Sequence, residues 1–233
     1  MIKIENAQIG HQHLLISIDE LKLPAGQLYA LIGRNGSGKS TFLHSLIGQL
    51  PLRAGQLSLG NFSVQALQND HLLRATHVSF VASMFPGIDA LTLHEYVSLG
   101  RLPYLGAFGR MQDKDLSFVD EVLSLLNLKS LAHRATQNIS DGERQLASLA
   151  RAIVQDTPYM ILDEPASFLD YFNRELLLEQ LQNWVQSNAN RTAIFSSHDI
   201  DLCLEKGIKL LVLHEQRLTL LEKPTKKEVM DLL

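Results

Sequence analysis

The feature that most constrains this chain is a glycine-rich stretch of eight residues. It fits the pattern G-x-x-x-x-G-K-[ST] in full and reads Gly33-Arg34-Asn35-Gly36-Ser37-Gly38-Lys39-Ser40. An apolar segment, residues 28–32, precedes it, and an amphipathic segment follows it. This order of strand, loop and helix is the context in which the pattern forms a phosphate-binding loop.

The residue types in this loop are those that hold phosphate. Glycines let successive backbone N–H groups turn inward around an anion, and the positive end of the following helix dipole adds to the attraction. Lys39 is expected to reach the β- and γ-phosphates of a nucleotide, and the Ser40 hydroxyl to bind Mg²⁺. We therefore predict that the phosphate loop, Gly33 to Thr41, binds a nucleoside triphosphate.

Apolar strand-like runs alternate with helix-like patterns along the chain. Further strands are predicted at 78–81, 159–162, 192–196 and 210–213, and their nearly continuous apolar character is typical of strands covered on both faces. Apolar residues at helical spacing form four stripes that we expect in the core: Phe42, Leu43, Leu46, Ile47 and Leu50; Phe118, Val119, Val122, Leu125 and Leu126; Leu146, Leu149, Ala150, Ile153 and Val154; and Leu177, Leu181, Trp184 and Val185. The alternation predicts an α/β fold with a mostly parallel sheet.

Length and composition narrow the class of protein. Of 233 residues, 45% are hydrophobic and 20% charged, as in ordinary globular proteins, and we expect one domain over 1–233 with a helical subdomain inserted at about 84–137. No apolar run approaches the roughly 20 residues that a membrane-spanning helix needs. A formal net charge of −4 argues against nucleic acid as a partner. The single cysteine, Cys203, is expected to be a buried helix residue.

The strand predicted at 159–162 ends in two adjacent carboxylates, Asp163 and Glu164. The first can hold Mg²⁺, and the second can polarise an attacking water as a general base. Because adjacent residues on a strand point to opposite sides, the two acids need not share one task.

Three further motifs resemble those of ATP-binding-cassette (ABC) ATPases. Residues 139–143, I-S-D-G-E, are similar to the family signature L-S-G-G-Q; residues 167–170, S-F-L-D, to its D-loop; and residues 196–199, S-S-H-D, to its switch-histidine segment. Together with the phosphate loop they follow the family order and cover nearly the whole chain. The resemblance implies a P-loop NTPase core with a mostly parallel sheet, an N-terminal antiparallel β region and the inserted helical subdomain.

The resemblance also implies a composite ATP site. In the family two copies bind head to tail, so a homodimer is expected in which Ser140 and the N–H of Gly142 donate to the γ-phosphate held by the other copy. Asp170 of the D-loop is placed at the same nucleotide. Glu164 is implied as the base for water, and His198 as a contact to the γ-phosphate. ATP and Mg²⁺ are therefore the expected cofactors.

Several positions depart from the family pattern. A glutamine normally follows the strand at 78–81; here Ser83 stands there and could bind Mg²⁺ with shorter reach, which predicts weak or strongly partner-dependent ATPase activity. The signature differs at Asp141 and Glu143, and because a carboxylate would repel the γ-phosphate, we expect Asp141 to point toward a cation or solvent. His11 stands where the family stacks an aromatic ring on adenine; a surface histidine without a role is the alternative.

The segment Gly100-Arg101-Leu102-Pro103 is similar to importer ATPases for iron–siderophore, haem and cobalamin uptake. It also fits a helix C-cap glycine followed by a proline stop. The importer resemblance implies integral membrane permease subunits that contact residues 83–104, a separate substrate-binding protein, and a peripheral location at the cytoplasmic face of the membrane. Two alternatives stay open. One is a soluble ABC ATPase that assembles a cytosolic complex; the other, a P-loop kinase or GTPase, is disfavoured by the signature and His198.

Overall fold

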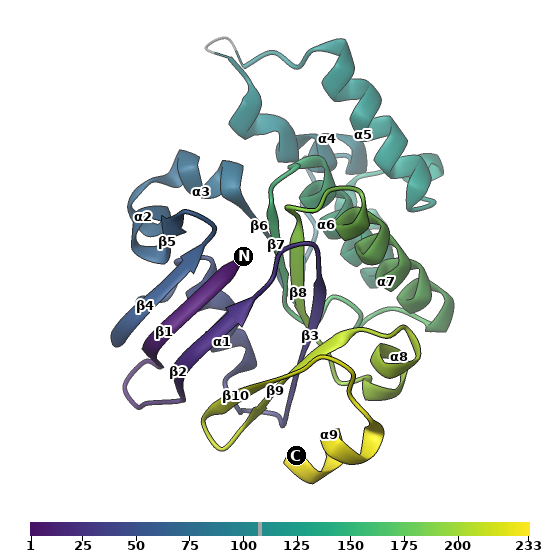
Figure 1. Ribbon diagram of the computed structural model, residues 1–233. Helices are drawn as coiled ribbons and strands as arrows, with labels where there is room; N and C mark the ends of the chain where they lie inside the picture. The colour runs from purple at the N-terminus through teal and green to yellow at the C-terminus, as the bar shows by residue number, and fades with distance from the viewer. Residues whose placement is uncertain (107–108) are drawn as a thin grey trace.

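The computed structural model describes residues 1–106 and 109–233, which form two β-sheets with helices packed between and around them (Figure 1). The smaller sheet is antiparallel, in the order β2-β1-β4-β5. Its strands are β1 (Ile2–Ile9), β2 (Ile16–Leu23), β4 (Ala54–Leu59) and β5 (Phe62–Ser63). The expected N-terminal antiparallel region is confirmed.

The larger sheet has six strands in the order β10-β9-β3-β8-β7-β6. All neighbouring pairs are parallel except β9 and β10, which form an antiparallel hairpin at one edge. The strands are β3 (Leu28–Gly33), β6 (Val78–Val81), β7 (Tyr159–Leu162), β8 (Thr192–Ser196), β9 (Lys209–His214) and β10 (Arg217–Leu221). All five predicted strands lie in this sheet, and the α/β prediction is confirmed.

The larger sheet is buried on both faces. In β3, Tyr29 and Leu31 face one core, together with α1 (Lys39–Leu46) and the antiparallel sheet, while Ala30 and Ile32 face a second core. Successive residues of a strand point to opposite faces, so a strand between two cores must be apolar at nearly every position. This is why β3 shows no alternation of polar and apolar residues.

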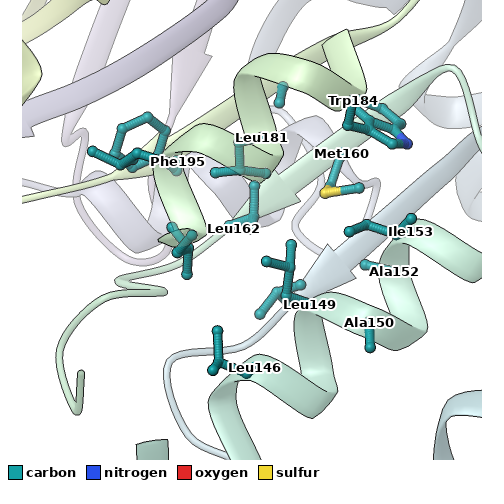
Figure 2. Close-up of a cluster of buried hydrophobic side chains, with 14 of the residues drawn as sticks. Leu146, Leu149, Ala150, Ala152, Ile153, Met160, Leu162, Leu181, Trp184 and Phe195 are labelled. Atoms are coloured by element: carbon teal, nitrogen blue, oxygen red, sulfur yellow. The ribbon is translucent and has the colours of Figure 1, made fainter. Parts of the chain in front are cut away.

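The second core is covered by α6 (Asp141–Val154) and α7 (Tyr171–Gln186). Figure 2 shows side chains of both helices, Leu149 and Leu181 among them, around Met160 and Leu162 of β7. The predicted apolar stripes of these two helices are fully buried. Cys203, on α8 (Ile200–Glu205), is buried as expected, and its burial raises the pKa of the thiol to about 12.

The regular elements between β6 and α6 are all helices within the described residues, and they lie at the upper end of the molecule in Figure 1. It contains α4 (Leu93–Ser98), η1 (Leu99–Tyr104), α5 (Asp113–Leu125), η2 (Lys129–Leu131) and η3 (Thr136–Asn138). The remaining helices are α2 (Val64–Asn69), α3 (His71–His77) and α9 (Lys226–Leu232). Within the described ranges, no helix has the length and apolar character to cross a membrane.

Two of the predicted stripes need correction. The helix α1 ends at Leu46, so Ile47 and Leu50 lie beyond it, although both are buried. Leu125 was expected in the core but is 47% exposed, because α5 ends at this residue and its neighbours Leu123 and Leu126 supply the buried contacts.

Candidate nucleotide site

Four neighbouring parallel strands end at one edge of the larger sheet and bring the predicted site residues together. The phosphate loop follows β3, His198 follows β8, Asp163 and Glu164 follow β7, and Ser83 follows β6. In open α/β sheets, ligands bind outside the carboxyl ends of the strands. The topology therefore assembles one candidate site from segments that lie far apart in the sequence.

The phosphate loop has the backbone conformation of an anion cradle. Gly36 and Gly38 have φ of 76° and 107°, in the left-handed region that favours glycine, and Gly38 begins α1. A Cβ atom on Gly33 would lie 2.8 Å from the Ser37 hydroxyl oxygen. That hydroxyl is buried without a hydrogen-bond partner in the part of the chain that the structure describes. A buried polar atom of this kind needs an external partner, and a phosphate oxygen would supply one.

Lys39 is buried and turns back onto the loop. Its Nζ donates hydrogen bonds to the carbonyl oxygens of Gly33 at 2.9 Å and Arg34 at 3.3 Å. Burial lowers the pKa of Lys39 below its ordinary value, although Glu164 and Asp163 pull it upward. The carboxylates of Asp163 and Glu164 are therefore close enough to Lys39 to attract its ammonium group.

The other predicted loop residues are accessible. Arg34, Asn35 and Ser40 are exposed, and Thr41 is half-buried. The Ser40 hydroxyl is therefore free of the core and open to a ligand at the start of α1.

The two acids after β7 have different surroundings, in line with separate tasks. Asp163 is buried, and its Oδ1 accepts a 2.7 Å hydrogen bond from the Ser196 hydroxyl. The same hydroxyl accepts a 2.7 Å hydrogen bond from the backbone N–H of Glu164. Glu164 has φ of 46°, a left-handed conformation that costs a non-glycine residue free energy. Ser196 thus fixes both acids at once, and sequence reasoning assigned it no role.

Glu164 and His198 are brought into direct contact. The imidazole Nε2 of His198 lies 2.9 Å from Oε1 of Glu164, and both side chains are partly exposed. A neutral imidazole that donates here would orient the carboxylate that is expected to act on water.

The signature forms the N-terminal cap of α6. The Ser140 hydroxyl donates to Oε2 of Glu143 at 2.8 Å, and the N–H of Glu143 donates to the Ser140 hydroxyl at 3.3 Å. This capping box explains why Glu143 stands at the third helical position. As expected, Asp141 contacts a cation: its carboxylate pairs with Arg144.

The D-loop lies against the signature. A Cβ atom on Gly142 would approach the carbonyl oxygen of Phe168 to 3.2 Å, so the two segments are in contact. Asp170 caps α7, where its Oδ1 accepts a 2.9 Å hydrogen bond from the N–H of Asn173. The structure therefore shows Asp170 in a capping contact, and its place at the nucleotide stays a prediction.

Ser83 and His11 lie at the margins of this arrangement. Ser83 is exposed in the loop after β6, next to Ala82, whose carbonyl accepts a 3.3 Å hydrogen bond from Nε2 of Gln145. His11 is exposed in the turn between β1 and β2, where its carbonyl accepts a 2.7 Å hydrogen bond from Arg53. Leu15 and Ile16, at the end of this turn, contact the position of Gly38, which places the turn beside the phosphate loop.

Polar side chains of α6 hold the outer edge of β6, a feature that sequence reasoning missed. Besides Gln145, Arg151 donates to the carbonyl of Phe80 at 3.3 Å, and Gln155, which caps the C-terminus of α6, donates to the carbonyl of Val78 at 3.4 Å. Unpaired groups at a sheet edge need such partners. These contacts tie the helix of the signature to the strand that leads to Ser83.

The interpretation of Gly100 as a C-cap glycine is wrong. Gly100 lies inside η1, where a Cβ atom would meet the carbonyl oxygen of Arg151 at 2.5 Å. Glycine is therefore needed for close packing on α6 and not for a helix stop. The neighbouring Arg101 donates to Oδ1 of Asp115 at 2.9 Å and to the carbonyl of Val154 at 3.0 Å, which fastens η1 to α5 and α6.

Comparison with known proteins agrees with this geometry. The family model for "ABC transporter" matches residues 17–167. The petrobactin import ATP-binding protein FpuD of Bacillus anthracis is 31% identical over 93% of this chain and 78% of its own. The probable siderophore transport system ATP-binding protein YusV of Bacillus subtilis (strain 168) is 30% identical over the same shares.

Solved structures give the same fold. A chain from a structure described as a metal-chelate type ABC transporter has a TM-score of 0.81 and 28% identity, over 99% of this chain and 88% of that chain. A dimeric bacterial ABC transporter cassette has a TM-score of 0.84 and 23% identity, over 97% of this chain and 100% of the other. Because the family model matches most of this chain, the chain belongs to the ABC transporter family and is one of its ATP-hydrolysing subunits.

Proposed function

We propose that this chain powers an ABC importer for metal chelates of the iron–siderophore, haem or cobalamin type. The observation that carries the proposal is its likeness, at 30–31% identity over 93% of the chain, to two ATP-binding proteins named for petrobactin and siderophore transport. The described residues contain no cluster of His, Cys, Asp and Glu that could hold a metal ion. Recognition of the chelate therefore falls to separate membrane and substrate-binding chains.

Hydrolysis follows from the residues at the sheet edge. Lys39 leaves its loop carbonyls and donates to the β- and γ-phosphates, and the free Ser37 hydroxyl and the loop N–H groups take further phosphate oxygens. Glu164 accepts a proton from the attacking water, and His198 holds the Glu164 carboxylate and contacts the γ-phosphate. Catalysis is then positioning and electrostatic stabilisation, with no covalent intermediate on the protein.

The donor set fits Mg²⁺, which prefers oxygen ligands and keeps several waters. The Ser40 hydroxyl and the Asp163 carboxylate would hold it, with Ser83 as a third ligand from the neighbouring strand end. When bound, Mg²⁺ neutralises charge on the phosphate oxygens. Ser196 keeps the Asp163 carboxylate in place for this task.

The chain carries one phosphate loop and one signature, which supports a homodimer with two composite ATP sites. In such a dimer Ser140 would exchange its bond to Glu143 for one to the γ-phosphate on the other copy. His11 would lie near the adenine, because its turn adjoins the phosphate loop.

The permease surface is assigned to residues 83–104. Four large apolar side chains are exposed there: Met84, Ile88, Leu102 and Tyr104. Exposed apolar side chains that form one patch are typical of a protein–protein contact, and these four are the candidates for such a patch here. In this arrangement the ATPase is peripheral, at the cytoplasmic face of the membrane.

Two variants test the enzyme. Lys39→Ala is expected to abolish ATP binding measured by calorimetry, because it removes the cation at the phosphates. Glu164→Gln is expected to keep binding, slow hydrolysis sharply, and accumulate an ATP-bound dimer. Normal hydrolysis by Glu164→Gln would disprove the assignment of the general base.

Co-purification from native membranes tests transport. A multispan membrane protein that is retained by the wild type, and lost from a Leu102→Asp, Met84→Asp variant, supports the importer. The alternative, assembly of a cytosolic complex, predicts a soluble scaffold and no effect of these two substitutions.

A further inference from the structure

The turn between β1 and β2, which carries His11, stands out from the body of the protein. His11, Gln12 and His13 are all exposed, and a groove of about 940 Å³ opens between this turn and residues 49–53. The turn is also tight: Gly10 has φ of 154°, and a Cβ atom there would lie 2.1 Å from the carbonyl oxygen of His13. A turn that faces solvent and a groove buries little apolar surface, so its position depends on hydrogen bonds.

A residue far along the chain, Arg53, supplies hydrogen bonds to this turn. Its guanidinium Nη1 donates to the carbonyl oxygens of His11 at 2.7 Å and of Gln12 at 3.2 Å. Its backbone N–H donates to the carbonyl oxygen of Gln8, in β1, at 2.8 Å. Hydrogen bonds from a charged donor are the stronger kind, and the guanidinium makes its bonds to the residues that would otherwise be free to move.

The other end of the turn is fixed beside the phosphate loop. The backbone N–H of Leu15 donates to the carbonyl oxygen of Ile9 at 2.9 Å, which closes the turn. The side chains of Leu15 and Ile16 lie 3.5–3.6 Å from the position of a Cβ atom on Gly38. The turn is therefore tied to the phosphate loop at one end and held by Arg53 in the middle.

We infer that Arg53 is a positioning residue for the nucleotide base: its guanidinium holds the backbone of the turn so that the His11 imidazole stands beside the adenine before ATP binds. An imidazole offers less stacking area than the larger aromatic rings, so the cost of ordering the turn takes a larger share of what the base contributes. A turn that Arg53 already holds avoids much of that cost. Arg53 acts through the turn and not by contact with the base. This inference rests on the proposed function, in which His11 lies near the adenine.

The test compares the affinities of ATP and inorganic tripolyphosphate by calorimetry, without divalent metal so that ATP is not hydrolysed. Tripolyphosphate has the phosphate chain without the nucleoside, so the ratio of the two affinities isolates what the nucleoside contributes. Arg53→Met is expected to weaken ATP binding about three- to tenfold and to leave tripolyphosphate binding within about twofold. A lost charge attraction, or a phosphate loop that does not fold, would weaken both ligands alike.

Two further variants and their combination complete the test. Arg217→Met makes the same change at an exposed arginine of β10 and should alter neither affinity. His11→Ala should lower the ratio of ATP to tripolyphosphate affinity at least as much as Arg53→Met does. The double variant should lose no more than His11→Ala alone, because Arg53 acts through His11.

The outcomes tell this inference apart from the proposed function. If the wild type binds neither ligand, both fail. If it binds both ligands and His11→Ala leaves the ratio unchanged, the place of His11 at the adenine and this inference fail, while ATP hydrolysis by Glu164 stands. If His11→Ala lowers the ratio and Arg53→Met does not, only the inference fails. Additive losses in the double variant would also overturn it, because Arg53 would then act independently of His11.

Discussion

Replacing Ser196 with alanine tests most directly how the strand ends position Asp163 and Glu164. The Ser196 hydroxyl is buried, donates to the Asp163 carboxylate and accepts from the Glu164 N–H, each at 2.7 Å. A hydrogen bond to a charged group contributes about 1.5–3 kcal/mol, and a stranded backbone N–H costs about 1 kcal/mol or more. The substitution should therefore lower the free energy of unfolding by about 2–4 kcal/mol.

The assay is urea unfolding followed by circular dichroism, with the denaturant slope compared between variants. ATP turnover is measured in parallel. Glu164 loses the contact that holds its left-handed conformation, so turnover should fall by about tenfold to a hundredfold, the usual cost of misplacing a catalytic group. ATP binding should persist, because among the described residues no hydrogen bond joins Ser196 to Lys39 or to the phosphate loop.

The same strand supplies a matched control. Thr192 of β8 is fully buried, and its hydroxyl has no hydrogen-bond partner among the residues that the structure describes. Thr192→Val removes a buried hydroxyl without breaking a bond, so it should leave stability unchanged or raise it slightly. Equal losses from Ser196→Ala and Thr192→Val would refute the reasoning, because burial alone would then explain both.

Three further predictions concern pH, the metal position and packing. Burial raises the pKa of Asp115, but the bonds from a backbone N–H and from Arg101 outweigh it and hold the pKa below its ordinary value. The stability that Asp115→Asn removes should therefore be fully present at pH 5–7 and decline as pH falls from about 4 through the lowered pKa. A difference in thermal unfolding that stays constant as the pH falls below about 4 would contradict this. Ser83→Gln restores the reach of the family side chain and should raise ATP turnover or its stimulation by membranes, whereas unchanged rates would remove Ser83 from the metal site. Gly100→Ala places a Cβ atom 2.5 Å from a carbonyl oxygen of α6 and should cost about 1–3 kcal/mol in urea unfolding. Gly106→Ala, whose Cβ atom would have no atom of the described residues within 4 Å, should cost almost nothing, and equal costs for the two variants would contradict the packing argument.

Much of this protein can be predicted from local sequence. The phosphate loop can be predicted because Gly36 and Gly38 stand where the backbone needs a positive φ, and Lys39 follows directly at the helix start. The central strands can be predicted because both of their faces are buried, so nearly every residue in them is apolar. The capping box of α6 also depends only on local sequence, because Ser140 and Glu143 are three residues apart.

Other features exist only once the strands are in register. Ser196 joins Asp163 and Glu164 across two parallel strands, more than thirty residues apart, and no local pattern marks a serine for that role. Gly100 has the sequence context of a helix stop, yet its reason is the carbonyl that α6 brings against it. The sequence by itself determined which groups are expected to hold phosphate, because the phosphate loop is formed by neighbours along the chain. The tertiary structure decided how the acids, His198 and α6 are positioned, because hydrogen bonds between distant segments depend on strand order and packing.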